Sequence, residues 1–427
     1  MKRRTLFRYL LASGACMASS MAYKPAHSLL DYKGKLLINV QLDGGVDFAG
    51  FCDPKLNKDL DYKINNWSDT QDIGMAGNIS YAPFAGNKAF FDKHHKNILV
   101  INGVDTQTNA HSVGITNTWS GRNSEGYPAL TAIWSAEKAA SLPLTYLNFG
   151  GFGDTQSLVS RTRINDIGSL RAIVDPNDSQ TGGEGYRNPQ DFERIKALQR
   201  KTLQNRLLQE DILHGEEIAM SSYYQSFLQM DELKSFSSLL PQESEIKPTV
   251  LAGTKRWRMD VQAQVALLAF KSGLSVSADL HGGGFDTHAN HDAVHEPLLK
   301  AATETVDFIW SYAEQLNLAD RLVLIISSDF SRTPEYNSGA GKDHHSVGSY
   351  LIMEKNAGYT NKVIGETDYE TFAIPINPNT LTPDSMSGIT LTPAHVHKAL
   401  RKYLGIRDTA TDKRFPFSAT EDLAFFG

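Results

Sequence analysis

Four segments of the chain combine a run of apolar, often β-branched residues with a polar end. They are residues 34–45 (GKLLINVQLDGG), 96–106 (KNILVINGVDT), 273–284 (GLSVSADLHGGG) and 320–330 (DRLVLIISSDF). Runs of this kind are typical of strands that are buried on both faces of a sheet. We therefore predict four buried strands.

Helical patterns lie between these strands. Residues 295–318 form one apolar helix face, with side chains three and four residues apart at Leu299, Ala302, Val306, Ile309, Ala313 and Leu316. Residues 254–273 form a second helix, which Gly273 ends just before a strand. Because strands alternate with helices, we predict an α/β fold with a mostly parallel sheet and helices on both of its faces.

Two further segments are predicted to be helical. Residues 187–245 are polar and carry no strand pattern, so we interpret them as a helical insertion that packs over the sheet and covers part of its active face. Residues 391–406 form a closing helix, with Thr392 as its N-cap and Pro393 in its first position.

Residues 1–22 have the features of an export signal. The paired Arg3 and Arg4 precede a short apolar run, and a small-x-small cleavage site ends at Ala22. The Arg pair resembles a twin-arginine signal, and an ordinary Sec signal is the alternative. Cys16 follows Ser-Gly-Ala and forms a weak lipoprotein-like site. We predict a periplasmic or secreted protein whose partner during export is the twin-arginine translocase.

The composition is that of a globular protein. The chain has 427 residues, 41% of them hydrophobic, and we predict a single domain at 23–427. Loss of the four basic residues of the signal leaves 38 basic and 48 acidic residues, a net charge of −10. Nucleic acid is therefore not an expected partner.

After removal of the signal, Cys52 is the only cysteine, which excludes an internal disulfide. No stretch after the signal is long and apolar enough to span a membrane.

Polar residues follow each of the four predicted strands. The clusters are Asp43 and Asp47; residues 105–114 (DTQTNAHSVG); Asp286, His288 and His291; and Asp329, with residues 341–346 (GKDHHS) soon after it. In an open α/β sheet the carboxyl ends of parallel strands share one edge, where ligands bind. Asp and neutral His side chains are ligands of zinc, manganese and iron. The pattern favours a site for one or two divalent metal ions, and the alternative is that Asp and His mark ordinary turns.

Three of these segments carry a family resemblance. Residues 282–288 (GGGFDTH) are similar to a GGWDTH signature, residues 327–346 to an SEFGRTPxxN…GxDHG block, and residues 42–47 (LDGGVD) to GGxDG. Together they resemble the bacterial secreted family known as domain of unknown function 1501, in the alkaline phosphatase and sulfatase superfamily. The resemblance covers most of residues 35–406. It implies that superfamily's fold and two metal ions bridged by a substrate phosphate or sulfate.

The resemblance also implies the ligands of the first metal ion. Asp286, His288 and His344 would hold it, and His291 competes with His288 for this role. Asp343 is either a further ligand or the residue that orients His344 through its ring N–H.

For the second metal ion, the resemblance implies Asp47 and Asp329 as ligands, with Asp43 as a competitor for Asp47. Phe330 stands where phosphatases of the superfamily have a histidine, which leaves this site short of a ligand. Arg332, from the same block, either clamps a substrate oxyanion or holds Asp329 or Asp343.

Superfamily members attack with a hydroxyl, or a modified Cys or Ser, at the start of the helix after the second strand. The family tends to show Arg-Ser-His there, whereas this chain has Ala110 before His111. The nearest hydroxyls are Thr108 and Ser112, and His111 is a ligand, an acid/base group or a structural residue. We predict that water activated by the metal attacks directly, and a covalent route through Thr108 or Ser112 is the alternative.

These interpretations lead to one functional hypothesis and one rival. The first is a secreted metal-dependent hydrolase whose partner is a small-molecule or polymer ester of phosphate or sulfate. The rival is a non-catalytic secreted binding or assembly protein in which a single metal is structural, and Phe330 favours it.

Overall fold

The computed structural model describes residues 32–59, 61–164, 167–175, 177, 188–209, 211–228, 233, 234, 237, 240, 258–417 and 421–427. An eight-stranded sheet has the order β12-β4-β11-β8-β1-β7-β5-β6. Its strands are β1 (Leu36–Asp43), β4 (Ile98–Asp105), β5 (Tyr146–Asn148), β6 (Arg161–Arg163), β7 (Ser277–Gly283), β8 (Leu322–Ser328), β11 (Val347–Glu354) and β12 (Lys362–Ile364). Only β11 is antiparallel to its neighbours. The predicted mostly parallel sheet is confirmed.

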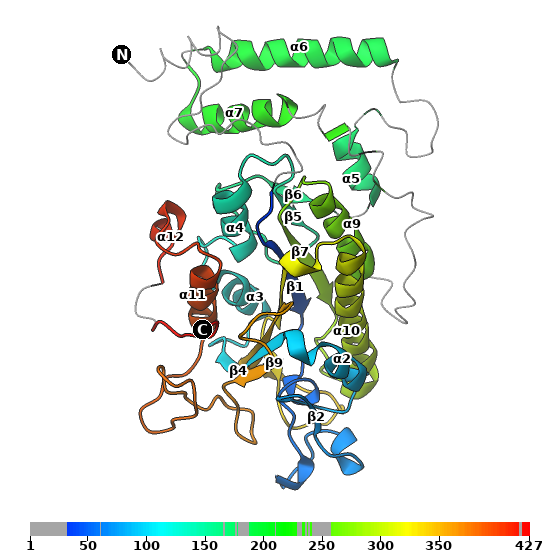
Figure 1. Ribbon diagram of the computed structural model, residues 1–427, viewed down its shortest axis with the longest axis vertical. Coiled ribbons are helices and arrows are strands. Elements are labelled where there is room, and N and C mark those ends of the chain that lie inside the picture. The colour runs from blue at the N-terminus through cyan, green and yellow to red at the C-terminus, as the bar shows by residue number, and fades with distance from the viewer. Residues whose placement is uncertain are drawn as a thin grey trace.

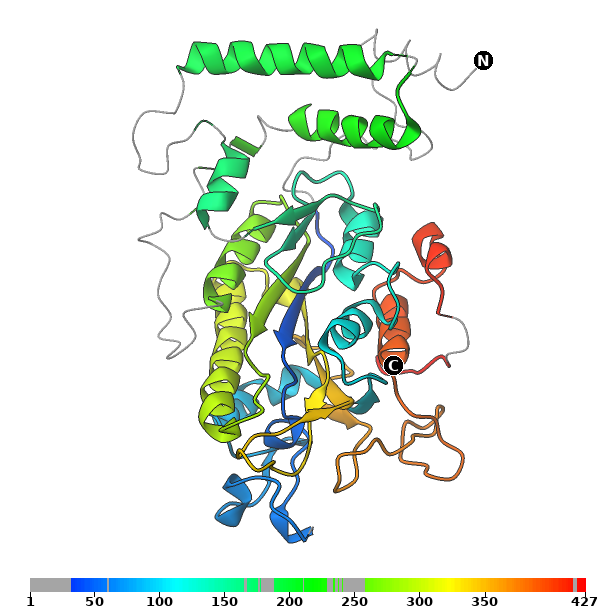
Figure 2. The ribbon, with the colours of Figure 1, turned by 180° about the vertical axis from the view of Figure 1, so that it is seen from behind.

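Helices cover both faces of this sheet. The chain forms the helices α2 (Asn87–His94), α3 (His111–Ser120), α4 (Leu130–Ala139), α5 (Ile167–Val174), α6 (Pro189–Leu207), α7 (His214–Leu228), α9 (Met259–Lys271), α10 (His291–Gln315), α11 (Pro393–Tyr403) and α12 (Ala410–Arg414). Both views place α2, α9 and α10 on one side of the sheet and α3, α4 and α11 on the other (Figures 1 and 2). The fold is thus a three-layer α/β architecture.

Short elements complete the fold around the sheet. Two small antiparallel pairs are β2 (Gly74–Ala76) with β3 (Ile79–Tyr81) and β9 (Ser331–Arg332) with β10 (His344–His345). The 3₁₀ helices are η1 (Phe48–Gly50), η2 (Asn57–Asp59), η3 (Trp67–Asp69), η4 (His95–Asn97) and η6 (Ala319–Arg321). Of these, η1, β9 and β10 follow strand ends and shape the candidate site.

The four predicted strands correspond to β1, β4, β7 and β8. In β1 every residue before Asp43 is buried, because helical layers cover both faces of the strand. Two of these buried residues are polar and have specific partners. Asn39 donates to Asp279 Oδ1 at 2.9 Å, and the Gln41 side chain exchanges hydrogen bonds with the backbone of Phe152. Gln41 thereby holds the loop after β5 against the centre of the sheet.

Helix α10 begins at His291, four residues before the predicted start. Asn290 adopts a left-handed conformation with φ of 48°, and the His291 N–H donates to the Ala340 carbonyl at 2.8 Å. The first turn of α10 is therefore fixed by the 337–343 segment, a contact that local periodicity does not reveal.

Within residues 187–245 the structure describes α6 and α7, which pack on each other. Their own apolar cluster contains Leu207, Ile212 and Tyr224. Figures 1 and 2 place both helices beyond the end of the sheet where β1 begins, opposite the carboxyl ends of the strands. The two described helices therefore do not cover the active face, contrary to the expectation for this segment; they share an apolar cluster with each other.

The predicted signal peptide 1–22, with Arg3, Arg4 and Cys16, lies outside the described residues. Cys52 is buried and unpaired. None of the helices in the described part of the chain is long and apolar enough to cross a membrane.

Candidate functional site

The turn after β1 brings the ends of β1, β7 and β8 together. Gly44 and Gly45 have φ angles of 112° and 81°, and their N–H groups donate to Asp329 Oδ1 at 3.0 and 2.8 Å. A Cβ at Gly44 would lie 2.5 Å from the backbone nitrogen of Asp286. Only glycine permits this backbone conformation together with so close an approach of the loop after β7.

Asp329 is fully buried at the end of β8, and its carboxylate is surrounded by donors. Besides the two glycine N–H groups, Oδ1 accepts from Ser328 Oγ at 2.9 Å. Oδ2 lies 2.5 Å from Nδ1 of His111, the first residue of α3. This hydrogen bond raises the pKa of His111 above its ordinary value. Asp329 thus orients His111.

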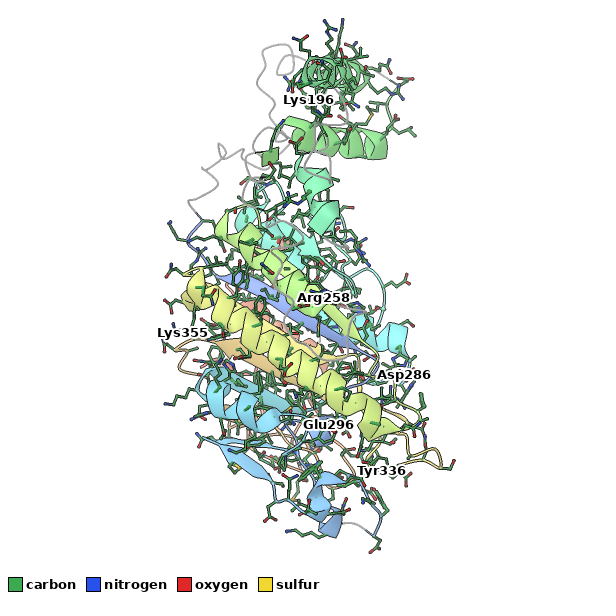
Figure 3. The ribbon with its side chains drawn as sticks, turned by 90° about the vertical axis from the view of Figure 1, so that its right-hand side faces the viewer. Lys196, Arg258, Asp286, Glu296, Tyr336 and Lys355 are labelled. Atoms are coloured by element: carbon green, nitrogen blue, oxygen red, sulfur yellow. The ribbon has the colours of Figure 1, made fainter. Side chains whose placement is uncertain are left out.

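His111, Asp286 and His344 converge on one point. His111 follows β4, Asp286 follows β7 and His344 lies in β10. One ligand atom from each lies within 4.8 Å of the others, and Nε2 of His111 and of His344 lie 3.5 and 3.3 Å from Asp286 Oδ1. Figure 3 shows Asp286 near the end of β1 and the first turn of α10. The structure therefore brings His111 to two of the residues predicted for the first metal ion.

His288 lies beside this group at the surface. Its Nε2 is 3.0 Å from both Asp286 Oδ1 and His344 Nε2, and its Nδ1 is 2.7 Å from Asp343 Oδ1. Asp343 therefore orients His288. The predicted pairing of Asp343 with His344 does not occur, because His344 Nδ1 lies 2.7 Å from the Asn109 carbonyl oxygen instead.

This donor set fits a divalent metal ion. Ligand atoms 2.0–2.1 Å from a tetrahedral centre lie about 3.3 Å apart, and the three Nε2-to-Oδ1 distances to Asp286 are 3.0, 3.3 and 3.5 Å. In His111, His288 and His344 an oxygen acceptor holds Nδ1, so Nε2 carries the free lone pair. Among the described residues, the buried Nε2 of His111 has no hydrogen-bond partner. A cation placed among these atoms would be bound by the Nε2 lone pairs and by Asp286 Oδ1 together.

Arg332 is fully buried among protein oxygens. Its Nε and Nη2 donate to the Gly45 and Gly44 carbonyls, and its Nη1 donates to the Lys342 carbonyl at 3.1 Å. Nη2 also donates to Asp286 Oδ1 at 2.7 Å. Burial alone would raise the pKa of Asp286, but Arg332 lowers it to about 2. Because four of its five N–H groups are used inside the protein, Arg332 does not clamp a substrate oxyanion as one prediction had it. The carboxylate that it holds is Asp286, and not Asp329 or Asp343 as the other prediction had it.

Asp47 lies in a separate buried network. Its Oδ2 accepts from Lys342 Nζ at 2.7 Å and lies 3.2 Å from His291 Nε2, while its backbone N–H donates to His295 Nε2 at 3.2 Å. Burial alone would raise the pKa of Asp47, but Lys342 and His291 lower it below its ordinary value. His291 Nδ1 pairs with Thr287 Oγ1 at 2.7 Å, so His291 is placed away from the first set of ligands.

The predicted second set, Asp47 with Asp329, is therefore not assembled. One carboxylate pairs with a lysine, and the other orients His111. Asp43, the competitor for Asp47, pairs with His281 Nε2 instead. Burial raises the pKa of Asp43 although His281 opposes the shift.

The two candidate nucleophilic hydroxyls lie at the start of α3. Thr108 Oγ1 accepts a hydrogen bond from the N–H of Ala110, the residue that precedes the helix, at 3.1 Å. Ser112 is exposed and directly follows His111 in the first turn. Of the two, Ser112 is the hydroxyl with the greater access to solvent.

Sequence reasoning missed the roles of three residues. The fully buried Phe330 packs its ring centroid 4.6 and 4.7 Å from those of His111 and His344, and so forms an apolar wall behind two imidazoles. Lys342 belongs to the predicted 341–346 cluster, and His281 to a predicted strand. No local signal distinguishes a buried lysine from an exposed one, since burial depends on the partner that the fold supplies.

Several solved structures are similar to this chain at low identity. The complex of Ps i-CgsB with k-i-k-neocarrahexaose is 9% identical with a TM-score of 0.40, over 89% of this chain and 74% of that one. The alkaline phosphatase from the Antarctic bacterium TAB5 is 12% identical with a TM-score of 0.35, over 78% and 95%. The lipoteichoic acid synthase LtaP from Listeria monocytogenes is 10% identical with a TM-score of 0.37, over 91% and 76%.

The sequence comparisons gave one family. A search among curated proteins found no match. Residues 35–382 match the family described as "Protein of unknown function (DUF1501)", a span that includes β1, both glycines of the turn and the whole group around Asp286. The chain therefore belongs to the DUF1501 family.

Proposed function

We propose that this protein is a metal-dependent hydrolase of phosphate or sulfate esters, with His111, Asp286 and His344 as the metal ligands. One observation carries the proposal: the Nε2 atoms of His111, His288 and His344 face a single carboxylate oxygen, while an oxygen acceptor holds each Nδ1. Metal-binding histidines have their second nitrogen held in this way, because the bond fixes the tautomer and the ring orientation.

A divalent ion in this place supplies Lewis-acid polarisation of an ester oxygen and neutralises charge that develops there. The chain contributes the remaining functions. The N-terminus of α3 starts at His111, so its first N–H groups, which have no partner inside the helix, are available to an anionic oxygen. Arg332 and Asp329 keep Asp286 and His111 in place.

We assign proton transfer to His288. Its side chain is 47% exposed, so it is open to substrate and solvent, and Asp343 holds its ring by Nδ1. An imidazole that is oriented by a carboxylate through Nδ1 has its Nε2 lone pair free and is well placed to accept a proton from an attacking water.

For the nucleophile we retain direct attack by water. The Thr108 hydroxyl accepts a hydrogen bond from the Ala110 N–H and so stabilises the segment that leads into α3. Ser112 is exposed, and among the described residues no basic side chain forms a hydrogen bond with its hydroxyl. A hydroxyl nucleophile needs an adjacent base or a lowered pKa, which supports water over Ser112.

The proposed function is tested by metal analysis followed by a substrate screen. The protein is produced without a histidine tag in metal-replete medium, its metal content is measured, and it is assayed against phosphate and sulfate mono- and diesters. We expect at least one tightly bound transition metal and turnover of one ester class. Bound metal without turnover of any ester would favour the non-catalytic binding or assembly protein, and less than a tenth of an equivalent of metal would reject both.

We also propose that residues 1–22 direct export by the twin-arginine translocase to the periplasm or beyond. This pathway carries folded proteins, and it would allow the metal ion to be inserted before export.

A further inference from the structure

We infer that the buried ammonium group of Lys342 takes the place of a second metal ion, so that the centre holds a single divalent ion per chain. The inference rests on the proposed function, since it concerns the same site. The family resemblance implies two metal ions, and the residues expected to hold the second ion are Asp47 and Asp329. Both oxygens of each carboxylate are already engaged by protein groups.

Both oxygens of Asp329 are engaged by the protein itself. Its Oδ1 accepts from the Gly44 N–H, the Gly45 N–H and Ser328 Oγ at 3.0, 2.8 and 2.9 Å, and Oδ2 pairs with His111 Nδ1 at 2.5 Å. A carboxylate has about four lone-pair sites. A metal ion on Oδ1 of Asp329 would have to displace the turn after β1, and one on Oδ2 would compete with His111.

Both oxygens of Asp47 are engaged in the same way. Its Oδ1 accepts from the N–H groups of Ala49 and Gly50 at 3.0 and 3.3 Å, which fixes the start of η1. Its Oδ2 lies 2.7 Å from Lys342 Nζ and 3.2 Å from His291 Nε2. The lysine supplies the positive charge that a divalent ion would otherwise bring to this carboxylate.

The site of Lys342 is built to hold an ammonium group. The side chain is fully buried, and Nζ lies 5.1 Å from the centre of the Tyr336 ring, within the range of a cation–π contact. Figure 3 shows Tyr336 on the same side of the molecule as Asp286. A buried charge without a partner is strongly destabilising, so this lysine and Asp47 depend on each other.

Lys342 also connects the segments that carry the metal ligands. Its N–H donates to the carbonyl of Thr287, between Asp286 and His288, at 3.0 Å. Its carbonyl accepts from Arg332 at 3.1 Å, and His344 follows two residues later. With its side chain on Asp47, the residue ties the turn after β1 to both ligand loops. Lys342 is therefore a positioning residue for the first metal site.

The stoichiometry of the wild-type protein is the first test. The full-length protein, stripped of metal with a chelator, is titrated with Zn²⁺ and separately with Co²⁺, and bound metal is measured by elemental analysis after gel filtration. We expect one equivalent per chain. Two tightly bound equivalents would overturn the inference and leave the proposed function standing, whereas no bound equivalent would overturn the proposed function itself.

The positioning role is tested with Lys342→Met. We expect Zn²⁺ affinity to fall by about 10- to 100-fold, the usual loss when a residue that supports the ligands is removed, and the Co²⁺ absorption spectrum to change. The matched control is Lys55→Met, which breaks another buried Lys–Asp pair, with Asp53 at 3.0 Å. The control should lower the melting temperature without a change in Zn²⁺ affinity.

A second variant covers the case in which Lys342→Met does not fold. The double change Asp47→Leu with Lys342→Met removes both buried charges and is expected to fold, because an apolar pair often replaces a buried ion pair. It should still bind Zn²⁺ at least about tenfold more weakly than the wild type. Wild-type affinity in either Lys342 variant would overturn the positioning role.

Discussion

Oδ2 of Asp329 lies 2.5 Å from Nδ1 of His111, and this contact joins the end of β8 to the first residue of α3. A carboxylate predicted to bind a metal ion directly thus acts through a histidine. The arrangement turns His111 Nε2 toward Asp286 and His344. It also explains how one site is assembled from three strand ends that are far apart in the sequence.

Asp329→Asn should weaken metal binding without unfolding the protein. The amide is nearly isosteric, but when its oxygen accepts the glycine N–H bonds, its NH₂ group faces His111 and cannot accept a hydrogen bond from Nδ1–H. We expect an affinity loss of about 10- to 100-fold, measured by Zn²⁺ titration. In the metal-free variant the pKa of His111, followed by NMR, should fall, because the bond with Asp329 is the main cause of its raised value. Asp343→Asn is the control: it acts on His288, so equal affinity losses in the two variants would contradict this assignment.

His288→Gln and His344→Gln should separate proton transfer from metal binding. We expect His344→Gln to lose most of the bound metal. His288→Gln should keep it and lose about 10²- to 10⁴-fold in kcat, the usual contribution of a general acid or base. Metal content and steady-state rates on the identified ester measure the two effects. Loss of metal from His288→Gln would make His288 a ligand instead.

Thr108→Ala and Ser112→Ala should both remain active if water attacks directly. Acid quenching during turnover should then leave the mass of the protein unchanged, whereas a covalent route would add the mass of the transferred phosphoryl or sulfuryl group. Loss of all activity in either variant, with metal content and folding intact, would point to a covalent intermediate at that hydroxyl.

Asp279 should make stability depend on pH. It is fully buried in β7, and burial raises its pKa to about 6 against the effect of hydrogen bonds from Tyr146, Thr131 and Asn39. Because the folded pKa exceeds the unfolded one, its contribution is present below about pH 4 and is lost as the pH rises through about 6. A shift from 3.8 to about 6 corresponds to about 3 kcal/mol.

The comparison is made with Asp279→Asn, whose side chain does not titrate. The free energy of unfolding of the wild type, relative to this variant, should fall by about 2 kcal/mol between pH 4 and pH 7. Denaturant unfolding at both pH values measures it. A constant difference between the two proteins would show that Asp279 is ionised throughout this range.

Replacement of Arg3 and Arg4 by Lys should leave the precursor in the cytoplasm, because the translocase reads an Arg pair. Fractionation of cells that express the double variant measures this, with the wild-type chain as control. Normal export of the variant in cells that rely on the twin-arginine pathway would favour a Sec signal.

The apolar pattern was sufficient to predict β1, β4, β7 and β8, their mostly parallel arrangement and the edge where the site lies. Strands that are buried on both faces need nearly continuous apolar runs, and such runs are visible locally. Asp286, His288 and His344 were also predicted to lie together, because each follows a strand end or belongs to the block after β8.

Only the tertiary structure decided which charged residues face each other. Lys342 and Asp47 are 295 residues apart in the chain, and Asp329 and His111 are 218 apart. The sequence shows only that a carboxylate follows a strand. It does not show whether a metal ion, a lysine or a histidine compensates the charge of that carboxylate. The choice depends on distances of a few ångströms in a buried environment, where an unpaired charge is too costly to remain. These distances are set only when the chain has folded and the turn that follows β1 packs against the segment that follows β8.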